Sequence, residues 1–380
     1  MALGVVALSF VACSSVLGLD DFARVDCVGD CASDGGGSAG SSHEGGSSSQ
    51  AGTTGSSRSG SVGAGSSSSG GNGSAGSSTV AGGGTEPVEG GTSPGAGTSP
   101  SGGSGGSTSS GPCPGGPAPA TAWKEHWYEH TEALSLRDYD DCVAVYVDPA
   151  MSATDSGWIF AFMSQAWLYN LTTYGKLGEQ RLYVVLHQSK YVNGHVSVEY
   201  ETTHDLRNVV DIGNASWTEG DYYRLPKLLS YIVEKTAVQG KRGSPGAAQW
   251  SSDGFSQIYS YDLFVGLGMT DDADDAFDRF EPTYFMFPVP NSYWFADFYY
   301  PVWRDHGKSK SLVNFFGLLE KYYPTTDQVM GPMNWGEYIH FSSGAARDDL
   351  QEQATYAFGW NDTWQGQIEQ ARVDFSGIEY

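Results

Sequence analysis

Histidine and carboxylate side chains are the residues of this chain best suited to chemistry, and one group of them is closely spaced. His126, Glu129 and His130 follow the pattern H-x-x-E-H, with two imidazoles and one carboxylate. Such a set binds Zn²⁺ when a helix places its members on one face and a distant acid completes the ligand shell. The alternative interpretation is a helix at the start of the globular part, which packs Trp127 against the core.

A second group consists of His187, His195 and His204, which lie on or near predicted strands. Adjacent strands can bring three such imidazoles together around a metal ion. Isolated histidines on strands more often make structural hydrogen bonds. The sequence leaves both interpretations open.

An acidic run covers residues 271–278, where five of eight side chains are Asp. The run lacks the Gly and the distal Glu of a Ca²⁺-binding EF-hand loop. We expect the first turn of a helix with Thr270 as its N-cap, because carboxylates near a helix N-terminus interact favourably with the macrodipole. Weak Ca²⁺ binding is the alternative.

The elements that must position these side chains form a sheet followed by helices. Apolar alternation and β-branched runs predict strands at 142–147, 181–187, 191–200 and 207–212, with one early helix at 157–174. From residue 225 onward the apolar period is helical. We therefore predict an α+β fold, with an N-terminal mixed sheet and an early helix followed by a mostly helical C-terminal half. The further predicted helices are 255–264, 271–280, 294–303, 311–322, 335–343, 348–358 and 362–375.

Four segments carry a resemblance to a known family. They are HDLRNVVDI (204–212), IVE (232–234), YDLFVGLGM (261–269) and MNWGEYIHFSSGAA (333–346). Together with the layout, they resemble the basic secretory protein-like metallopeptidases, a gluzincin-type group, over most of residues 123–375. The resemblance implies a zincin-like fold. In that family the helix ending in Ile-Val-Glu carries H-E-x-x-H, whose histidines bind Zn²⁺ and whose Glu is the general base.

This chain departs from the family pattern at the zinc-binding positions. Lys227 and Tyr231 stand where the two histidines are expected, Leu228 replaces the base, and Gln257 stands where the next helix supplies an acidic ligand. A Lys ammonium has no lone pair, and Leu228 cannot accept a proton. Zinc is expected in the family but not here, so we expect no cofactor and no catalysis at these vestigial positions.

Aromatic and acidic side chains are the remaining candidates for ligand binding. Glu234 and Tyr261 belong to the family-like segments, and Trp294 lies in a dense aromatic run at 284–301. Aromatic rings beside acids are typical of surfaces that bind sugars, although such runs are more often core. A peptide or a glycan is the ligand class we expect.

The N-terminus predicts export. Residues 1–12 contain an apolar run of the length found in secretion signals. Val11-Ala12-Cys13 resembles a bacterial lipobox, and the resemblance implies lipidation of Cys13 and attachment to the outer membrane or cell surface. The alternative is a cleaved signal and full secretion.

Four further cysteines make an even count in an exported chain, which predicts disulfides. Sequence proximity favours Cys27–Cys31 and Cys113–Cys142 among the three possible connectivities. Zinc binding by Cys27 and Cys31 is the rival interpretation.

Composition divides the chain. Residues 31–120 contain 29 Gly and 25 Ser among 90 residues, too little apolar surface to fold. We predict a signal segment 1–12, a mature N-terminus 13–31 with a small Cys loop, a disordered linker 32–120 and a globular zincin-like domain 121–380. The net charge of −24 argues against nucleic acid as a partner.

These observations predict a surface-tethered lipoprotein that meets the membrane through its N-terminal lipid. Its metallopeptidase-like domain is expected to have lost zinc binding and catalysis, leaving a ligand-binding or structural role. Two alternatives stay open. One is an active secreted metal-dependent hydrolase with a non-standard site such as His126, Glu129 and His130, and the other is a glycan-binding surface module.

Overall fold

The computed structural model describes residues 113, 116–152, 157–217, 222–250 and 253–380. All of them belong to one compact unit. The signal segment, the lipidation position Cys13, the Cys27–Cys31 pair and most of the linker lie outside the described residues.

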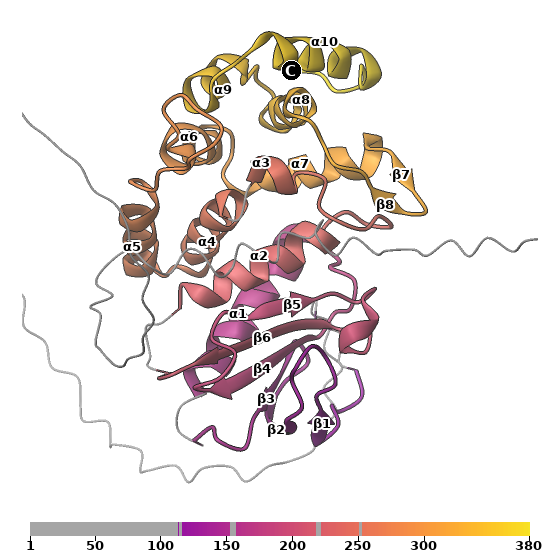
Figure 1. The fold of residues 1–380 in the computed structure, drawn as a ribbon, viewed down its shortest axis with the longest axis vertical. Helices are drawn as coiled ribbons and strands as arrows, with labels where there is room; N and C mark the ends of the chain where they lie inside the picture. Colours follow the sequence, from indigo (N-terminus) through magenta and orange to yellow (C-terminus); the bar gives the residue numbers. More distant parts are fainter. Residues whose placement is uncertain (1–112, 114–115, 153–156, 218–221, 251–252) are drawn as a thin grey trace, which may run out of the picture. The chain divides into compact units, whose positions relative to one another are not determined.

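A six-stranded mixed sheet forms the N-terminal half of the described chain (Figure 1). Its strand order is β1-β2-β3-β4-β6-β5, with β3, β4 and β6 parallel and the other pairs antiparallel. The sheet and the helices that follow it confirm the predicted α+β class. The strands are β1 (Ala122–Lys124), β2 (Ala133–Tyr139), β3 (Val143–Val147), β4 (Leu182–Gln188), β5 (His195–Ser197) and β6 (Asn208–Asn214).

Two helices cover one face of this sheet. The helix α1 (Gly157–Tyr174) spans the residues predicted for it and connects β3 to β4, since parallel neighbours require a crossover. The helix α2 (Arg224–Thr236) packs on β5 and β6. Val184 and Val210 point toward these helices and join the main core. Alternation along a strand therefore sends their neighbours to the opposite face.

The opposite face is covered by the segment at the start of the globular part. Trp123 packs there on Tyr146 and Tyr183, and Trp127 packs on Trp123, in a second, smaller core. The predicted helix around Trp127 is wrong. Residues 125–132 form a turn between β1 and β2, and Tyr128 has φ of 50°, a left-handed conformation that interrupts a helix.

Two sequence-based strand expectations need correction. The strand predicted at 191–200 is only the three residues of β5, because Tyr191 and Gly194 both have positive φ and turn the chain before it. The strands β1 and β2 were not predicted at all. They matter because β1 ends immediately before Glu125, a residue of the site described below.

The C-terminal half is helical, as predicted. Within it α2 and α4 lie side by side (Figure 1). The acidic run forms α5, but Thr270 is its first residue and makes no side-chain cap, so the predicted capping role is wrong. The remaining elements are η3 (Thr202–His204), α3 (Ala247–Trp250), α4 (Gly254–Leu267), α5 (Thr270–Phe280), the π-helical η4 (Phe295–Tyr299), α6 (Tyr300–Asp305), α7 (Ser309–Tyr322), β7 (Thr325–Thr326), β8 (Val329–Met330), α8 (Trp335–Ala346), α9 (Gln351–Phe358) and α10 (Asp362–Asp374).

The predicted disulfide between Cys113 and Cys142 is present and fastens the end of the linker to the residue before β3. In the described part of the chain, no helix has the length and apolar character needed to cross a membrane.

Candidate metal centre

Six titratable side chains converge on the sheet face opposite α1 and α2. They form two groups that share Asp211, and within each group the potential ligand atoms lie within 4.8 Å of one another. Residues far apart in the sequence supply them, so the sheet topology brings them together. We name this set the histidine–carboxylate cluster, and its members are Glu125, His130, His187, His195, His204 and Asp211.

Strand alternation and register explain why these side chains meet. On β6, Val210 and Ile212 face the helices, so Asp211 between them faces the other side. His187 lies near the carboxyl end of the neighbouring parallel strand β4. The antiparallel register of β5 places His195 directly opposite Asp211. Three strands thus direct their polar side chains to one end of the same face.

The first group contains three buried atoms that face one another. His187 Nε2 lies 3.0 Å from Glu125 Oε1 and 3.1 Å from Asp211 Oδ1. All three side chains are 0% exposed. The contacts among the three atoms are ion pairs when His187 carries a proton, but none has the geometry of an aligned hydrogen bond. Charged groups buried without aligned hydrogen bonds are costly. A cation between these atoms would contact all three.

The spacing of the first group fits a small divalent cation. His130 completes the group, with Nδ1 3.1 Å from Asp211 Oδ2 and 3.6 Å from Glu125 Oε1. Zinc–ligand bonds of 2.0–2.1 Å place neighbouring ligands of a tetrahedron about 3.3–3.4 Å apart. The distances within the group lie on both sides of this value. Two imidazoles with two carboxylates are also a donor set that Zn²⁺ accepts.

Neighbouring side chains hold the ligands in place. Asp148, immediately after β3, has Oδ2 3.3 Å from His187 Nδ1, which leaves Nε2 directed at the cluster. A carboxylate behind a histidine in this way orients the ring and raises its basicity as a metal ligand. His130 stacks on Tyr191 with ring centroids 3.4 Å apart, and Trp127 donates its indole N–H to Asp211 Oδ2 at 2.8 Å.

The second group is more open. His195 Nε2 and His204 Nε2 are 2.9 Å apart, and Asp211 Oδ2 lies 3.5 Å from His195 Nε2. His204 is buried and its Nδ1 contacts Thr203 Oγ1 at 3.0 Å. The side chain of His195 is 16% exposed, so this group borders solvent.

Electrostatics within the cluster favour positive charge at its centre. Burial alone would lower the pKa of His130 and of His187, but hydrogen bonds and charge from Asp211 and Glu125 raise both to about 9. Burial would raise the pKa of Glu125, yet bonds from the two histidines bring it down to about 2. Burial lowers the pKa of His204 to about 3. Protons on His130 and His187 and a metal ion are therefore competing ways to neutralise the carboxylates.

The predicted H-x-x-E-H set does not assemble. His130 joins the cluster, but His126 pairs with Asp205 at 3.2 Å near the surface and Glu129 is exposed. The prediction required a helix that places the three side chains on one face, and the turn at 125–132 separates them instead.

His187, His195 and His204 all lie near Asp211, but they do not form the single set that the sequence suggested. His187 belongs to the first group, and His195 and His204 belong to the second, with His204 on η3 rather than on a strand. Sequence reasoning missed Glu125, Asp148 and Asp211. A signal for Asp211 was present, because a single acid stands within the apolar run of β6 and is fully buried. A charge buried in a strand needs a partner or a metal.

The four positions that the resemblance compared with a zinc site lie on the adjacent helices α2 and α4 or beside them. Lys227 Nζ on α2 forms an ion pair with Asp253 Oδ1 at 2.6 Å, next to the start of α4. Leu228 is buried in the core, Tyr231 packs against it and Gln257 is buried on α4.

The candidate ligand-binding residues are not displayed on a surface. Glu234 is buried and accepts a hydrogen bond from Ser244 at 3.2 Å, and burial raises its pKa to about 8. Trp294 is 1% exposed and stacks on Phe285. Tyr261 is half-buried and packs against Trp303. Trp294 therefore belongs to the core, the more frequent interpretation of the aromatic run, and its ring is not exposed to a sugar. The carboxylates of α5 form none of the clusters that can hold a metal ion in the described part of the chain.

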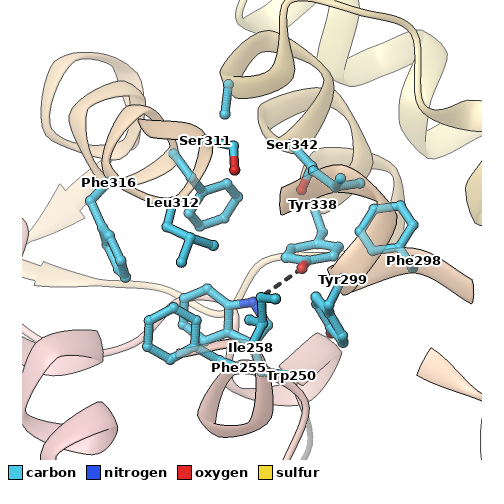
Figure 2. Close-up of a pocket in the computed structure, with 13 residues that line it drawn as sticks. Trp250, Phe255, Ile258, Phe298, Tyr299, Ser311, Leu312, Phe316, Tyr338 and Ser342 are labelled. Atoms are coloured by element: carbon cyan, nitrogen blue, oxygen red, sulfur yellow. Dashed lines mark hydrogen bonds between the residues drawn. The ribbon is translucent and has the colours of Figure 1, made fainter. Parts of the chain in front are cut away.

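Figure 2 shows a separate, mainly apolar cavity among the C-terminal helices. Its volume is about 40 Å³, and Phe255, Phe298 and Leu312 are among its lining residues. Trp250 donates its indole N–H to the Tyr338 hydroxyl across it at 3.1 Å. One water needs about 10–15 Å³ of such space, so the cavity is too small for a sugar or a peptide.

Comparisons with known proteins bring no further information. No protein family, characterised protein or solved structure matches the chain.

Proposed function

We propose that the chain is an exported, lipid-anchored protein whose globular domain binds one transition-metal ion, preferentially Zn²⁺, through Glu125, His130, His187 and Asp211. The observation that carries the proposal is the contact of His187 Nε2 with Glu125 Oε1 at 3.0 Å and with Asp211 Oδ1 at 3.1 Å, three buried atoms that make no aligned hydrogen bond. Export and lipidation rest on residues 1–13 of the sequence.

The ion is assigned a structural role in this group. Four protein ligands that are all buried make a closed site, which is the arrangement of structural rather than catalytic zinc. Glu125 and His130 belong to the turn after β1, whereas His187 and Asp211 belong to β4 and β6. The ion thereby fastens the turn at 125–132, with Trp127, onto the sheet.

The helical half supports a second element of the proposal, a peptidase-like layout without a peptidase centre. A sheet is followed by the adjacent helices α2 and α4, as the family resemblance implies. At the position of the zinc-binding histidines stands the Lys227–Asp253 ion pair. An ammonium group repels a dication, so the domain acts as a ligand-binding or structural module and not as a peptidase.

Metal analysis of the purified full chain tests this proposal. After dialysis we expect at least one tightly held Zn²⁺ per chain, and loss of the ion bound by Glu125 in the Glu125→Gln variant. Glu129→Gln is the matched control, since Glu129 is exposed in the same turn, and it should retain the ion. Casein should not be cleaved. An absence of retained metal would refute the metal site, and chelator-sensitive cleavage of casein would refute the loss of peptidase function.

A further inference from the structure

We propose that His195 and His204 bind a second metal ion together with Asp211, so that the centre is dinuclear and Asp211 is its bridging carboxylate. The inference rests on the proposed function, because the first ion shares Asp211. The second ion has an open coordination position that takes a small anion from solvent.

Asp211 lies between the two groups, and its two oxygens have different neighbours. Its Oδ1 is 3.1 Å from His187 Nε2 in the first group. Its Oδ2 is 3.5 Å from His195 Nε2 in the second group, and it also accepts from Trp127 at 2.8 Å and lies 3.1 Å from His130 Nδ1. Once His130 Nδ1 binds the first ion instead of Oδ2, one of the two lone pairs of Oδ2 is available for a second ion, so the carboxylate can bridge.

The two imidazoles of the second group face each other through the atoms that bind metals. The distance of 2.9 Å between His195 Nε2 and His204 Nε2 equals the separation of about 2.9 Å for two ligands at a right angle around an ion with bonds of 2.0–2.1 Å. Thr203 Oγ1 contacts the other ring nitrogen of His204, which fixes the ring with Nε2 directed at the group. If the two Nε2 atoms shared a hydrogen bond, only one of them would use its lone pair, because the other would carry the proton. An ion bound between the rings uses the lone pairs of both Nε2 atoms.

The protein supplies only part of the coordination shell of the second ion. Three ligands and a partly exposed His195 describe an open site, unlike the four buried ligands of the first group. Tyr128, an exposed ring 4.9 Å from the His195 ring, stands at the same border with solvent. Zn²⁺ holds ligands at a right angle only when it is five- or six-coordinate, because its four-coordinate sites are tetrahedral, and the higher coordination number leaves room for added ligands.

Charge identifies what fills the open position. Two dications bring four positive charges, and Glu125, Asp148 and Asp211 bring three negative charges. Lys190, 3.9 Å from Asp148, adds one positive charge, which Glu132 balances at 2.6 Å. One positive charge remains, and an anion balances it. Hydroxide formed from a bound water and inorganic phosphate belong to this class. The second ion therefore gives the domain a place for exchangeable anions that the closed first ion lacks.

Counting bound ions in the full chain tests the inference. The chain is stripped with chelator, loaded with excess Zn²⁺, freed of unbound metal by gel filtration and analysed by mass spectrometry. We expect two ions in the wild type and one in His195→Ala. His126→Ala, which removes a histidine outside the cluster, is the matched control and should hold two. In the Co²⁺-loaded chain, inorganic phosphate should change the visible absorption of the wild type but not of His195→Ala.

The outcomes separate this inference from the proposed function. One ion in the wild type and one in His195→Ala would overturn the second site and leave the first intact. No retained ion in the wild type would overturn both. Two ions in both proteins would overturn the assignment to His195. If circular dichroism shows that His195→Ala does not fold, the bound ions are counted in His195→Gln instead. Gln is closer to His in side-chain volume than Ala is, and the same loss of one ion is expected.

Discussion

His187 Nε2 lies 3.1 Å from Asp211 Oδ1, although the strand register pairs His187 with Gly213 and Asp211 with Val185. The imidazole therefore reaches diagonally along the sheet to the carboxylate of the next strand. Both atoms are buried and neither has a hydrogen bond of acceptable geometry. His187 Nε2 also lies 3.0 Å from Glu125 Oε1. The two carboxylates therefore favour a positive charge at this buried position.

Removing the shared carboxylate should cost both metal and stability. In Asp211→Asn the histidines lose the charge that holds them, and we expect loss of bound Zn²⁺ and a fall in unfolding free energy of about 3–5 kcal/mol, the cost of breaking a buried ion pair. Urea unfolding measures the change. Asp205→Asn, near the surface beside His126, is the control. Equal destabilisation of both variants would contradict a central role for Asp211.

Chelation should destabilise the wild-type chain. An ion that binds only the folded state stabilises it by about 4 kcal/mol when its free concentration is 1,000 times Kd. For a domain of this size, that corresponds to a fall of about 10 °C in the melting temperature when the metal is removed. Differential scanning fluorimetry with and without chelator measures the shift. If a chain shown to hold zinc had the same melting temperature with and without chelator, the ion would not stabilise the folded state.

Substitution of Lys227 on α2 should leave metal binding unchanged. Lys227→Ala removes an ion pair that is partly exposed to solvent, and such pairs contribute under about 1 kcal/mol. We expect a small loss of stability, no change in metal content and no peptidase activity. Metal analysis beside urea unfolding checks all of this. A gain or loss of bound zinc in this variant would place the metal centre at α2.

Stability should depend on pH through Glu234. Burial raises its pKa to about 8 in the folded chain, from an ordinary value near 4.5. Between these values the folded state keeps a proton that the unfolded state has released, so stability falls as pH rises from about 4.5 to 8, by up to roughly 1.4 kcal/mol per pH unit.

The Glu234→Gln variant isolates this effect. An amide has no proton to lose, so the variant should be more stable than the wild type at pH 8 and should show a shallower decline between pH 5 and 8. Melting temperatures across this range make the comparison. The exposed Glu129→Gln should keep the wild-type slope. Parallel pH profiles for wild type and Glu234→Gln would show that Glu234 is not the group responsible.

The Cys113–Cys142 disulfide should stabilise the domain. It closes a loop with a sequence separation of 29, for which loop-closure entropy gives about 3–4 kcal/mol. The double variant Cys113→Ser/Cys142→Ser should be less stable by that amount in urea unfolding. Reduction of the wild type should produce the same loss. No difference between oxidised and reduced chains would indicate that the bond constrains little in the unfolded state.

Much of the fold was predictable because it depends on local patterns. Apolar periodicity gave α1 at its observed bounds, and the β-rich runs predicted β3, β4 and β6. The short strands β1 and β2 were missed, since their pairing is set by contacts rather than by composition. The positive φ of Tyr128 and Tyr191 likewise depends on tertiary packing, and it explains the errors at 126–130 and 191–200.

The candidate metal centre was predictable only in part. The strand histidines could be proposed as a group because residues at equivalent positions of neighbouring strands meet. Glu125 could not be placed, because it reaches the cluster through a turn that sequence patterns assigned to a helix. Of the carboxylates in the cluster, only Asp211 could have been predicted from the sequence, because it is a single acid within an apolar strand. The site therefore depends on topology, and topology is the part of a fold that local sequence specifies least.

The most direct measurement is an anomalous-scattering map at the zinc absorption edge from crystals of the zinc-loaded full chain. We predict a peak enclosed by Glu125, His130, His187 and Asp211, at about 2.0–2.2 Å from the ligand atoms. A peak beside Lys227 on α2, or no peak on the face of the sheet that carries Asp211, would contradict it.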